Sequence, residues 1–178
     1  MGSRVLCGVA MEHAESTKIL ISTGNFTSAI GLLRLQYEAL VRAMWVLYVA
    51  SENEVNKVAE GLTPENAKKS EKIPMLSEML TKLNGKAPAE AIQMLLEFKE
   101  YSWKPLSSYV HGGAHATHWH KNGYPVTLLE QVLKASNGVS TMVAMLLVIL
   151  SGDIQQRGKI TRLQMLYSDC LPELKHGS

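Results

Sequence analysis

One segment of the chain, residues 26–50, predicts a helix that is apolar on almost every side. Its charged residues are limited to Arg34, Glu38 and Arg42, while apolar residues face nearly every other direction: Ile30, Leu32, Leu33, Leu35, Tyr37, Ala39, Leu40, Ala43, Met44, Val46 and Leu47. A surface helix keeps a polar face along its length, whereas a helix that is apolar all round lies at the centre of a fold. We therefore expect a central helix over Phe26–Ala50, covered on most sides by other elements.

Residues 126–150 repeat this pattern. Glu130 and Lys134 lie in the first half of the segment, and no charged residue occurs over the 18 positions from 135 to 152. Only Met142–Leu150 is continuously apolar, which is about half of the ~20 residues that a bilayer span needs. We interpret Val126–Leu150 as a buried core helix rather than a membrane span. Two such helices predict a compact bundle whose remaining apolar face is closed by a second copy.

Proline, glycine and asparagine divide the remaining sequence into shorter helices, and no strand-like alternation separates them. We expect helices over residues 4–23, 52–60, 75–83, 88–103 and 106–110, another that begins at Thr63-Pro64-Glu65, and a C-terminal helix over about 160–171. A loop is expected over 114–124. The predicted fold class is all-α: a four- to six-helix bundle with an antiparallel up-and-down core, forming one domain over residues 1–178 with its core at about 20–155.

The composition excludes several functional classes. Charged residues make up 19% of the chain and apolar residues 46%, which argues against disorder. The formal net charge of +2 does not by itself indicate a nucleic-acid partner. Cys7 and Cys170 form neither a disulfide scaffold nor a zinc-binding pair, and no signal peptide is evident, so we expect a cytoplasmic protein. We expect no cofactor and no membrane association.

The three charges of the central helix follow one another at intervals of four residues, so Arg34, Glu38 and Arg42 form a single stripe. Burying a charge costs several kcal/mol unless the charge is paired and hydrogen-bonded. We therefore expect a partly buried polar network. A solvated stripe with two ion pairs along the helix is the alternative.

A second segment, Tyr101–His115, gathers hydroxyl groups, a lysine and two histidines around a short predicted helix that ends at Gly112-Gly113. Ser107 and His111 are four residues apart and share a helix face. His118 and His120 follow, so four of the six histidines lie within ten residues.

Four interpretations of this histidine-rich segment stay open. His111, His115, His118 and His120 offer ligands for zinc. Ser107 or Ser108 beside a histidine offers a nucleophile pair. His111 could instead perform acid–base chemistry on a phosphodiester, with Lys or Arg stabilising the charge on phosphorus. The fourth interpretation is structural, with the serines capping backbone groups and His111 hydrogen-bonded in the core.

Two motifs together, Leu33-Arg34-Leu35-Gln36-Tyr37-Glu38-Ala39 and Ser107-Ser108-Tyr109-Val110-His111-Gly112-Gly113, resemble HEPN-like all-α proteins. The likeness is greatest to an uncharacterised bacterial branch with an R-x3-E helix followed by an S-x-x-x-H-G helix, and it covers roughly residues 20–155. It implies a four- to five-helix bundle, homodimers, and metal-independent RNase activity in toxin–antitoxin or abortive-infection systems. The catalytic pattern of the family is Arg, four to six residues, then His. His111 matches the His, whereas Lys104, followed by Pro105, stands where the Arg is expected.

The resulting hypothesis is a cytoplasmic, homodimeric, HEPN-like protein of a bacterial defence or toxin–antitoxin system that binds RNA or another phosphate-bearing ligand and is a candidate endoribonuclease. The expected catalytic residues are His111, Arg34, Glu38 and Lys104; the expected substrate-binding residues are Ser107, Ser108, Arg42 and His115; no metal is expected. The alternative is a non-catalytic dimeric interaction module, with an antitoxin or other defence-system protein as partner, in which Arg34, Glu38, Ser107 and His111 form a structural network.

Overall fold

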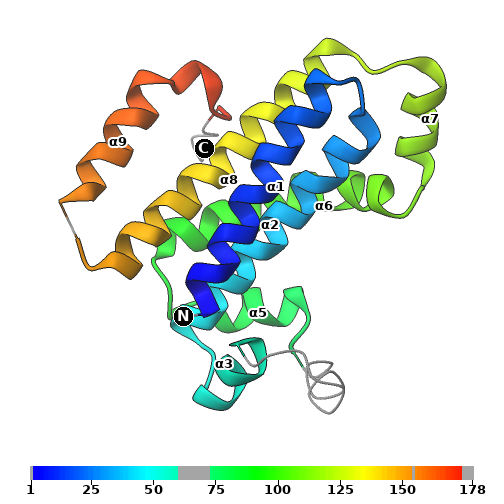
Figure 1. Ribbon diagram of the computed structural model, residues 1–178. Helices are drawn as coiled ribbons and strands as arrows, with labels where there is room; N and C mark the ends of the chain where they lie inside the picture. The colour runs from blue at the N-terminus through cyan, green and yellow to red at the C-terminus, as the bar shows by residue number, and fades with distance from the viewer. Residues whose placement is uncertain (1, 60–72, 154, 174–178) are drawn as a thin grey trace.

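The computed structural model describes residues 2–59, 73–153 and 155–173, and the regular secondary structure in these segments is entirely helical (Figure 1). The all-α prediction is confirmed. The described residues hold eight α-helices, more than the four to six expected, and the helix expected to begin at Thr63 lies outside the described residues. The elements are α1 (Gly2–Ser22), α2 (Phe26–Tyr48), α3 (Glu52–Ala59), α5 (Leu76–Leu83), α6 (Ala89–Val110), α7 (Ala114–Asn122), α8 (Val126–Ser151), α9 (Gln156–Leu166) and the 3-10 helix η1 (Ser168–Cys170).

Helix α2 occupies the centre of the fold, as its apolar sequence predicts. It packs against α1, α5, α6 and α8 (Figure 1). Of its 23 residues, 13 are buried. Helix α1 lies antiparallel to it, because the Ser3 hydroxyl near the start of α1 donates to the Ala43 carbonyl near the end of α2, at 2.8 Å. Gly24 makes the turn between the two helices with φ +79°, a left-handed conformation that glycine adopts without strain.

Helix α8 is buried on one side rather than all round, so the prediction of a nearly all-buried helix is wrong for this segment. Its buried residues follow a helical stripe, and only 33% of its most apolar 18-residue window is buried. By length and composition α8 is long and apolar enough to cross a membrane, and it packs against α1 and α2. The prediction fails because, among the described elements, the faces of α8 turned away from α1 and α2 meet mainly α9, which itself buries no residue.

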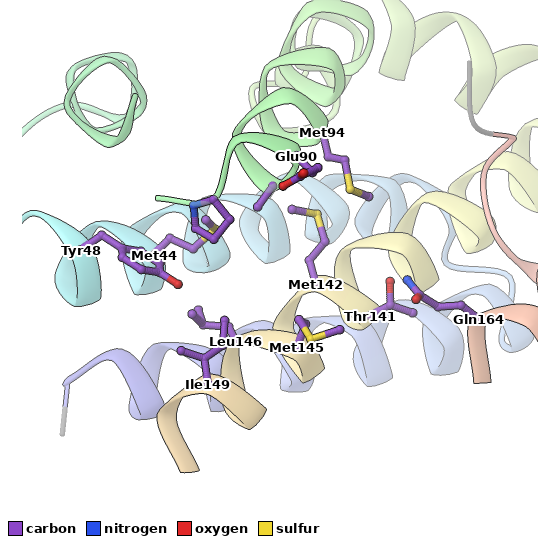
Figure 2. A pocket seen from close by; sticks show the side chains of 12 residues that line it. Met44, Tyr48, Glu90, Met94, Thr141, Met142, Met145, Leu146, Ile149 and Gln164 are labelled. Atoms are coloured by element: carbon purple, nitrogen blue, oxygen red, sulfur yellow. The ribbon is translucent and has the colours of Figure 1, made fainter. Parts of the chain in front are cut away.

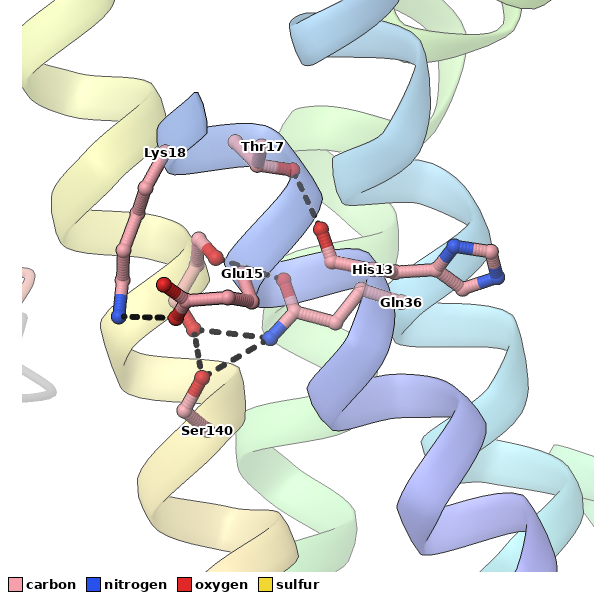
Figure 3. Close-up of polar contacts among 7 residues, drawn as sticks. His13, Glu15, Thr17, Lys18, Gln36 and Ser140 are labelled. Carbon is pink, nitrogen blue, oxygen red and sulfur yellow. Dashed lines mark hydrogen bonds and ion pairs between the residues drawn. The ribbon is translucent and has the colours of Figure 1, made fainter. Parts of the chain in front are cut away.

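A buried polar contact joins α2 to α8 (Figure 3). The Gln36 amide nitrogen donates to the Ser136 carbonyl at 3.0 Å and to the Ser140 hydroxyl at 3.1 Å. The Ser136 hydroxyl in turn donates to the Gln36 amide oxygen at 2.8 Å. Gln36 and Ser136 are both fully buried, and the contact fixes the register of the two helices because every polar group in it has a partner.

Helix α6 continues through Pro105, so the predicted interruption between Trp103 and Leu106 is wrong. Proline lacks the N–H that an interior helix position donates, and it usually ends or kinks a helix. Here Leu106 and Tyr109 are buried beyond the proline. The Ser107 hydroxyl also donates to the Trp103 carbonyl at 2.7 Å across the affected turn. Tertiary packing on both sides of the proline therefore outweighs its local preference.

The segment predicted as a loop over residues 114–124 contains helix α7, so that prediction is also wrong. The Ser108 hydroxyl accepts a hydrogen bond from the His115 N–H at 2.8 Å and satisfies one of the first donors of the helix. Ala116 is buried. The cap comes from seven residues upstream, across the turn at Gly112, and a local sequence pattern does not contain it.

The C-terminal part of the described chain forms α9 and η1 in place of one helix over about 160–171. Helix α9 has no buried residue. The segment after it returns to α8, where the Asn137 amide donates to the Cys170 carbonyl at 3.0 Å. The Pro172 ring lies so close to Gly138 that a Cβ there would be 2.9 Å from it.

Candidate functional site

The predicted polar network forms on α2. Arg34 Nε donates to Glu38 Oε1 at 2.9 Å, and Arg42 Nη2 lies 3.6 Å from Glu38 Oε2. The Arg34 and Glu38 side chains are 15% and 16% exposed, whereas Arg42 is 51% exposed. One carboxylate is therefore shared by two guanidinium groups, of which the inner one is held in a largely buried ion pair.

Helix α6 supplies two further partners of the Arg34 guanidinium. Its central carbon lies 4.2 Å from the centre of the Trp103 ring, within the range of a cation–π interaction. Its Nη1 atom lies 3.3 Å from Nε2 of His111. Because arginine has no acceptor, Nη1 donates and the imidazole Nε2 accepts, which places the ring proton of a neutral His111 on Nδ1. The structure thus brings together Arg34, Glu38 and His111, three of the predicted catalytic residues.

Trp103 is the residue of this site that sequence reasoning missed. It lies four residues before Ser107 and eight before His111, so the three residues share one face of α6. The spacing of four residues from Trp103 to Ser107 and from Ser107 to His111 is the sequence signal that could have placed Trp103 at the site. Nothing in the sequence indicated that the ring would stack on a side chain from residue 34.

The corner between α6 and α7 holds His111 at the surface. His111 ends α6, where its N–H donates to the Ser107 carbonyl at 3.1 Å, and its side chain is exposed. Gly112 reverses the chain with φ +66°, and the Gly113 N–H donates to the Ser108 carbonyl at 2.7 Å. A Cβ at Gly113 would lie 2.8 Å from the Ser108 hydroxyl, so glycine leaves the α7 cap undisturbed.

The other predicted site residues have different positions. The Ser107 hydroxyl donates to the backbone, and the Ser108 hydroxyl caps α7, so neither forms a nucleophile pair with His111. Lys104 and His115 are exposed, and within the described segments no hydrogen bond or ion pair joins their side chains to Arg34 or His111. Among the described residues, no group of three or more His, Cys, Asp or Glu side chains is placed to hold a metal ion.

A second polar cluster, also missed from the sequence, lies on the same face of α2. The Thr27 hydroxyl lies 2.5 Å from the Tyr124 hydroxyl and 3.3 Å from Nδ1 of His120. Thr27 precedes Arg34 by seven residues, which places it two turns away on the same helix face, at about 10 Å along the axis. The chain therefore contacts α2 through a histidine at the end of α6, His111, and through another near the end of α7, His120.

Burial perturbs a tyrosine between these two clusters. The pKa of Tyr109 is raised to about 12, mainly because burial disfavours the phenolate and secondarily because Tyr124 is close by. Tyr109 is therefore protonated at neutral pH and serves packing. His111 is exposed at the end of α6, so solvent reaches the outer side of the Arg34–His111 contact.

These features define an all-helical protein with an Arg–Glu–His cluster at the surface of its central helix. Residues 7–173 match a family of unknown function, DUF6988, and the chain belongs to this family. No curated protein and no solved structure matches the chain.

Proposed function

We propose that this protein is a HEPN-like, homodimeric, cytoplasmic member of a bacterial defence or toxin–antitoxin system that binds RNA and cleaves it with His111 as the acid–base residue. The observation that carries the proposal is the 3.3 Å contact between Arg34 Nη1 and Nε2 of an exposed His111. It places a fixed positive charge beside an imidazole that solvent can reach. The resemblance of the two motifs to HEPN-like proteins supports the class of system.

The chemistry follows from this pair. When substrate binds, Arg34 Nη1 turns from His111 Nε2 to a phosphoryl oxygen, which frees the Nε2 lone pair. Nε2 then takes the proton of a ribose 2′-hydroxyl, whose oxygen attacks the neighbouring phosphorus. The bond from phosphorus to the 5′-oxygen breaks, a 2′,3′-cyclic phosphate forms, and the 5′-oxygen leaves with a proton from water or from protonated His111. Arg34 stabilises the negative charge that develops on the phosphoryl oxygens. Glu38 is a positioning residue, because it fixes Arg34 through Nε without touching substrate.

The exposed His111 beside the Arg34 guanidinium, which stacks on the Trp103 ring, favours a single-stranded nucleic acid as the ligand. Small-molecule sites are mostly apolar cavities, whereas proteins that bind single-stranded nucleic acids combine positive charge along the backbone with aromatic side chains on which bases stack. Thr27, His120 and Tyr124 add hydroxyl and imidazole groups about 10 Å along α2 from Arg34, on the same face. We assign this second cluster to the nucleotides next to the scissile phosphate.

The alternative function is a non-catalytic dimeric interaction module in which Arg34, Glu38, Ser107 and His111 are structural. It is favoured by the burial of the ion pair, since Arg34 is only 15% exposed and already stacks on Trp103. The Ser107 hydroxyl bonds its own helix rather than facing the site. In this case an antitoxin or another defence-system protein is the partner.

The deciding experiment compares wild type with His111→Ala and Arg34→Lys, with His118→Ala as the matched control because His118 is an exposed histidine on α7. Growth and total-RNA integrity are followed after induction, and purified proteins are incubated with labelled single-stranded RNA. Loss of an acid–base residue should lower cleavage by about 10²–10⁴-fold. Arg34→Lys should weaken cleavage as well, because lysine lacks the planar fork of arginine.

The outcomes separate the two functions. Cleavage by wild type and His118→Ala but not by His111→Ala supports the nuclease. Intact RNA and equal growth with all four proteins would refute it and favour the interaction module. Circular dichroism of each variant establishes that the variants are folded.

A further inference from the structure

A groove runs between α6 and α8, with α2 as its floor, and we call it the methionine groove. It comprises two hollows of about 380 and 220 Å³ that share Met94 and Met142. In the larger hollow, methionine side chains converge from three helices (Figure 2). Both α6 and α8 pack against α2, so the groove is the space that they leave between them.

The lining of the methionine groove is apolar and adaptable. Its four methionines are Met44, Met94, Met142 and Met145, and aromatic and aliphatic side chains make up most of the remaining lining. Methionine is flexible and polarizable, so surfaces rich in it accept apolar side chains of varied shape. The methionine, aromatic and aliphatic side chains of the groove therefore favour a ligand with apolar side chains over a polar or charged one.

The length of the groove fits a helix. On α8 the lining extends from Ala135 to Ile149, which corresponds to about 21 Å at 1.5 Å per residue. The two hollows are centred about six to seven residues apart along α8, or roughly 10 Å. This is the distance between side chains at positions i and i+7 of a helix, the anchors by which an amphipathic helix occupies a groove.

The charge along the groove has one sign. Glu90, Glu97 and Glu173 line the two hollows, and none of the lining residues in the described segments is Lys, Arg or His. The ion pairs within the described part of the chain involve Glu15 and Glu38 instead. Within the described segments the three carboxylates of the groove therefore have no ion-pair partner, and they attract a cationic partner.

We propose that the methionine groove binds a basic amphipathic helix of a partner protein, with its apolar side chains in the two hollows and its Lys or Arg residues beside the three glutamates. A second copy docked groove to groove would bring two acidic rims together, which is unfavourable. The groove is lined by residues other than the Arg34, Glu38 and His111 of the proposed RNA site. Its floor residues Tyr37, Met44 and Tyr48 lie about a quarter turn around α2 from Arg34 and Glu38.

The test uses a fluorescein-labelled peptide of about 16 residues, with leucines at i, i+3, i+4, i+7 and i+11 and lysines elsewhere. Its controls are the same peptide with glutamate in place of lysine and a scrambled peptide of the same composition. Anisotropy is measured with wild type, with Glu90→Lys/Glu97→Lys, and with Glu12→Lys/Glu130→Lys. The last variant changes net charge equally at exposed positions outside the groove.

Wild type and the Glu12→Lys/Glu130→Lys control should bind the basic peptide about tenfold or more tightly than either control peptide, and Glu90→Lys/Glu97→Lys should lose this preference. Met94→Lys should abolish binding while circular dichroism shows an intact fold, since Met94 is 36% exposed.

Equal binding of the basic and acidic peptides, or equal affinity of both double variants, would overturn the proposal. A dimer in sedimentation that Met94→Lys dissociates would assign the groove to a second copy and would also overturn it. Binding of dodecyltrimethylammonium without binding of the peptide would assign the groove to an amphiphilic cation and would likewise overturn the proposal. None of these outcomes depends on RNA cleavage.

Discussion

Replacing Ser136 with alanine should destabilise the protein more than the loss of one hydroxyl suggests. Ser136 and Gln36 are fully buried, and the Ser136 hydroxyl donates to the Gln36 amide oxygen at 2.8 Å. Alanine leaves that buried oxygen without its donor, and an unsatisfied buried polar group costs about 1–3 kcal/mol. In a domain of this size, 1 kcal/mol shifts Tm by about 2–4 °C, so we expect a decrease of roughly 2–12 °C.

The mechanism is tested by a double-mutant cycle with Gln36→Met. Methionine has a similar shape and no polar group, and in the double variant no buried side-chain amide or hydroxyl of this pair is left unpaired. The Ser140 hydroxyl keeps its bond to the Ser136 carbonyl at 2.8 Å. The double variant should therefore be less destabilised than the sum of the single variants, with a coupling energy of about 0.5 kcal/mol or more.

Urea denaturation followed by circular dichroism measures all four free energies of unfolding. Ser28→Ala, at an exposed serine of α2, is the control for the substitution itself. Strictly additive effects of Ser136→Ala and Gln36→Met would refute the reasoning, because two groups that exchange a hydrogen bond cannot be energetically independent.

Two further predictions concern the thiols and the α6–α7 corner. Burial raises the pKa of the Cys7 thiol to about 11, whereas Cys170 is exposed, so iodoacetamide at pH 8 should label only Cys170 in the folded protein and both cysteines in urea. Because the folded-state pKa is raised, the contribution of Cys7 to stability is present below pH 9 and is lost as the pH rises towards 11. The urea midpoint of wild type should therefore fall more than that of Cys7→Ala over this range. Gly113→Ala should lower Tm, because its Cβ would lie 2.8 Å from the Ser108 hydroxyl, whereas Gly8→Ala, with nothing within 4 Å, should stabilise α1 by about 0.5–1 kcal/mol. Equal shifts for both alanine variants would contradict the close contact at Gly113.

Helical periodicity was sufficient to predict the centre of the fold. The scarcity of charge over residues 26–50 predicted a central α2, and the spacing of Arg34, Glu38 and Arg42 predicted their network. Both inferences depend only on how residues of one helix are distributed around its axis, which the sequence spacing determines. The same reasoning gave the wrong burial for α8, because an apolar sequence does not specify whether every face of the helix meets another element.

The residues around Arg34 could be predicted only in part. The sequence pointed to His111, but the contact to Arg34 joins residues 77 positions apart and depends on how α6 crosses α2. The stacking on Trp103 depends on the same crossing. Helix α7 was missed for a related reason: its cap comes from Ser108, which reaches His115 only because Gly112 adopts a left-handed conformation.

The weak attachment of α9 means that opening this end of the molecule requires far less energy than global unfolding. Helix α9 buries no residue, and the chain after it contacts α8 at the Cys170 carbonyl and the Pro172 ring. Amide hydrogens in α9 should therefore exchange through local openings, whereas those in the buried part of α2 should exchange only when the whole domain unfolds. Arg157 and Arg162 lie in α9, so brief trypsin treatment should cleave at these residues before it cleaves at Arg34 in the central helix. The molecule thus combines a cooperative helical core with a terminal unit that opens independently.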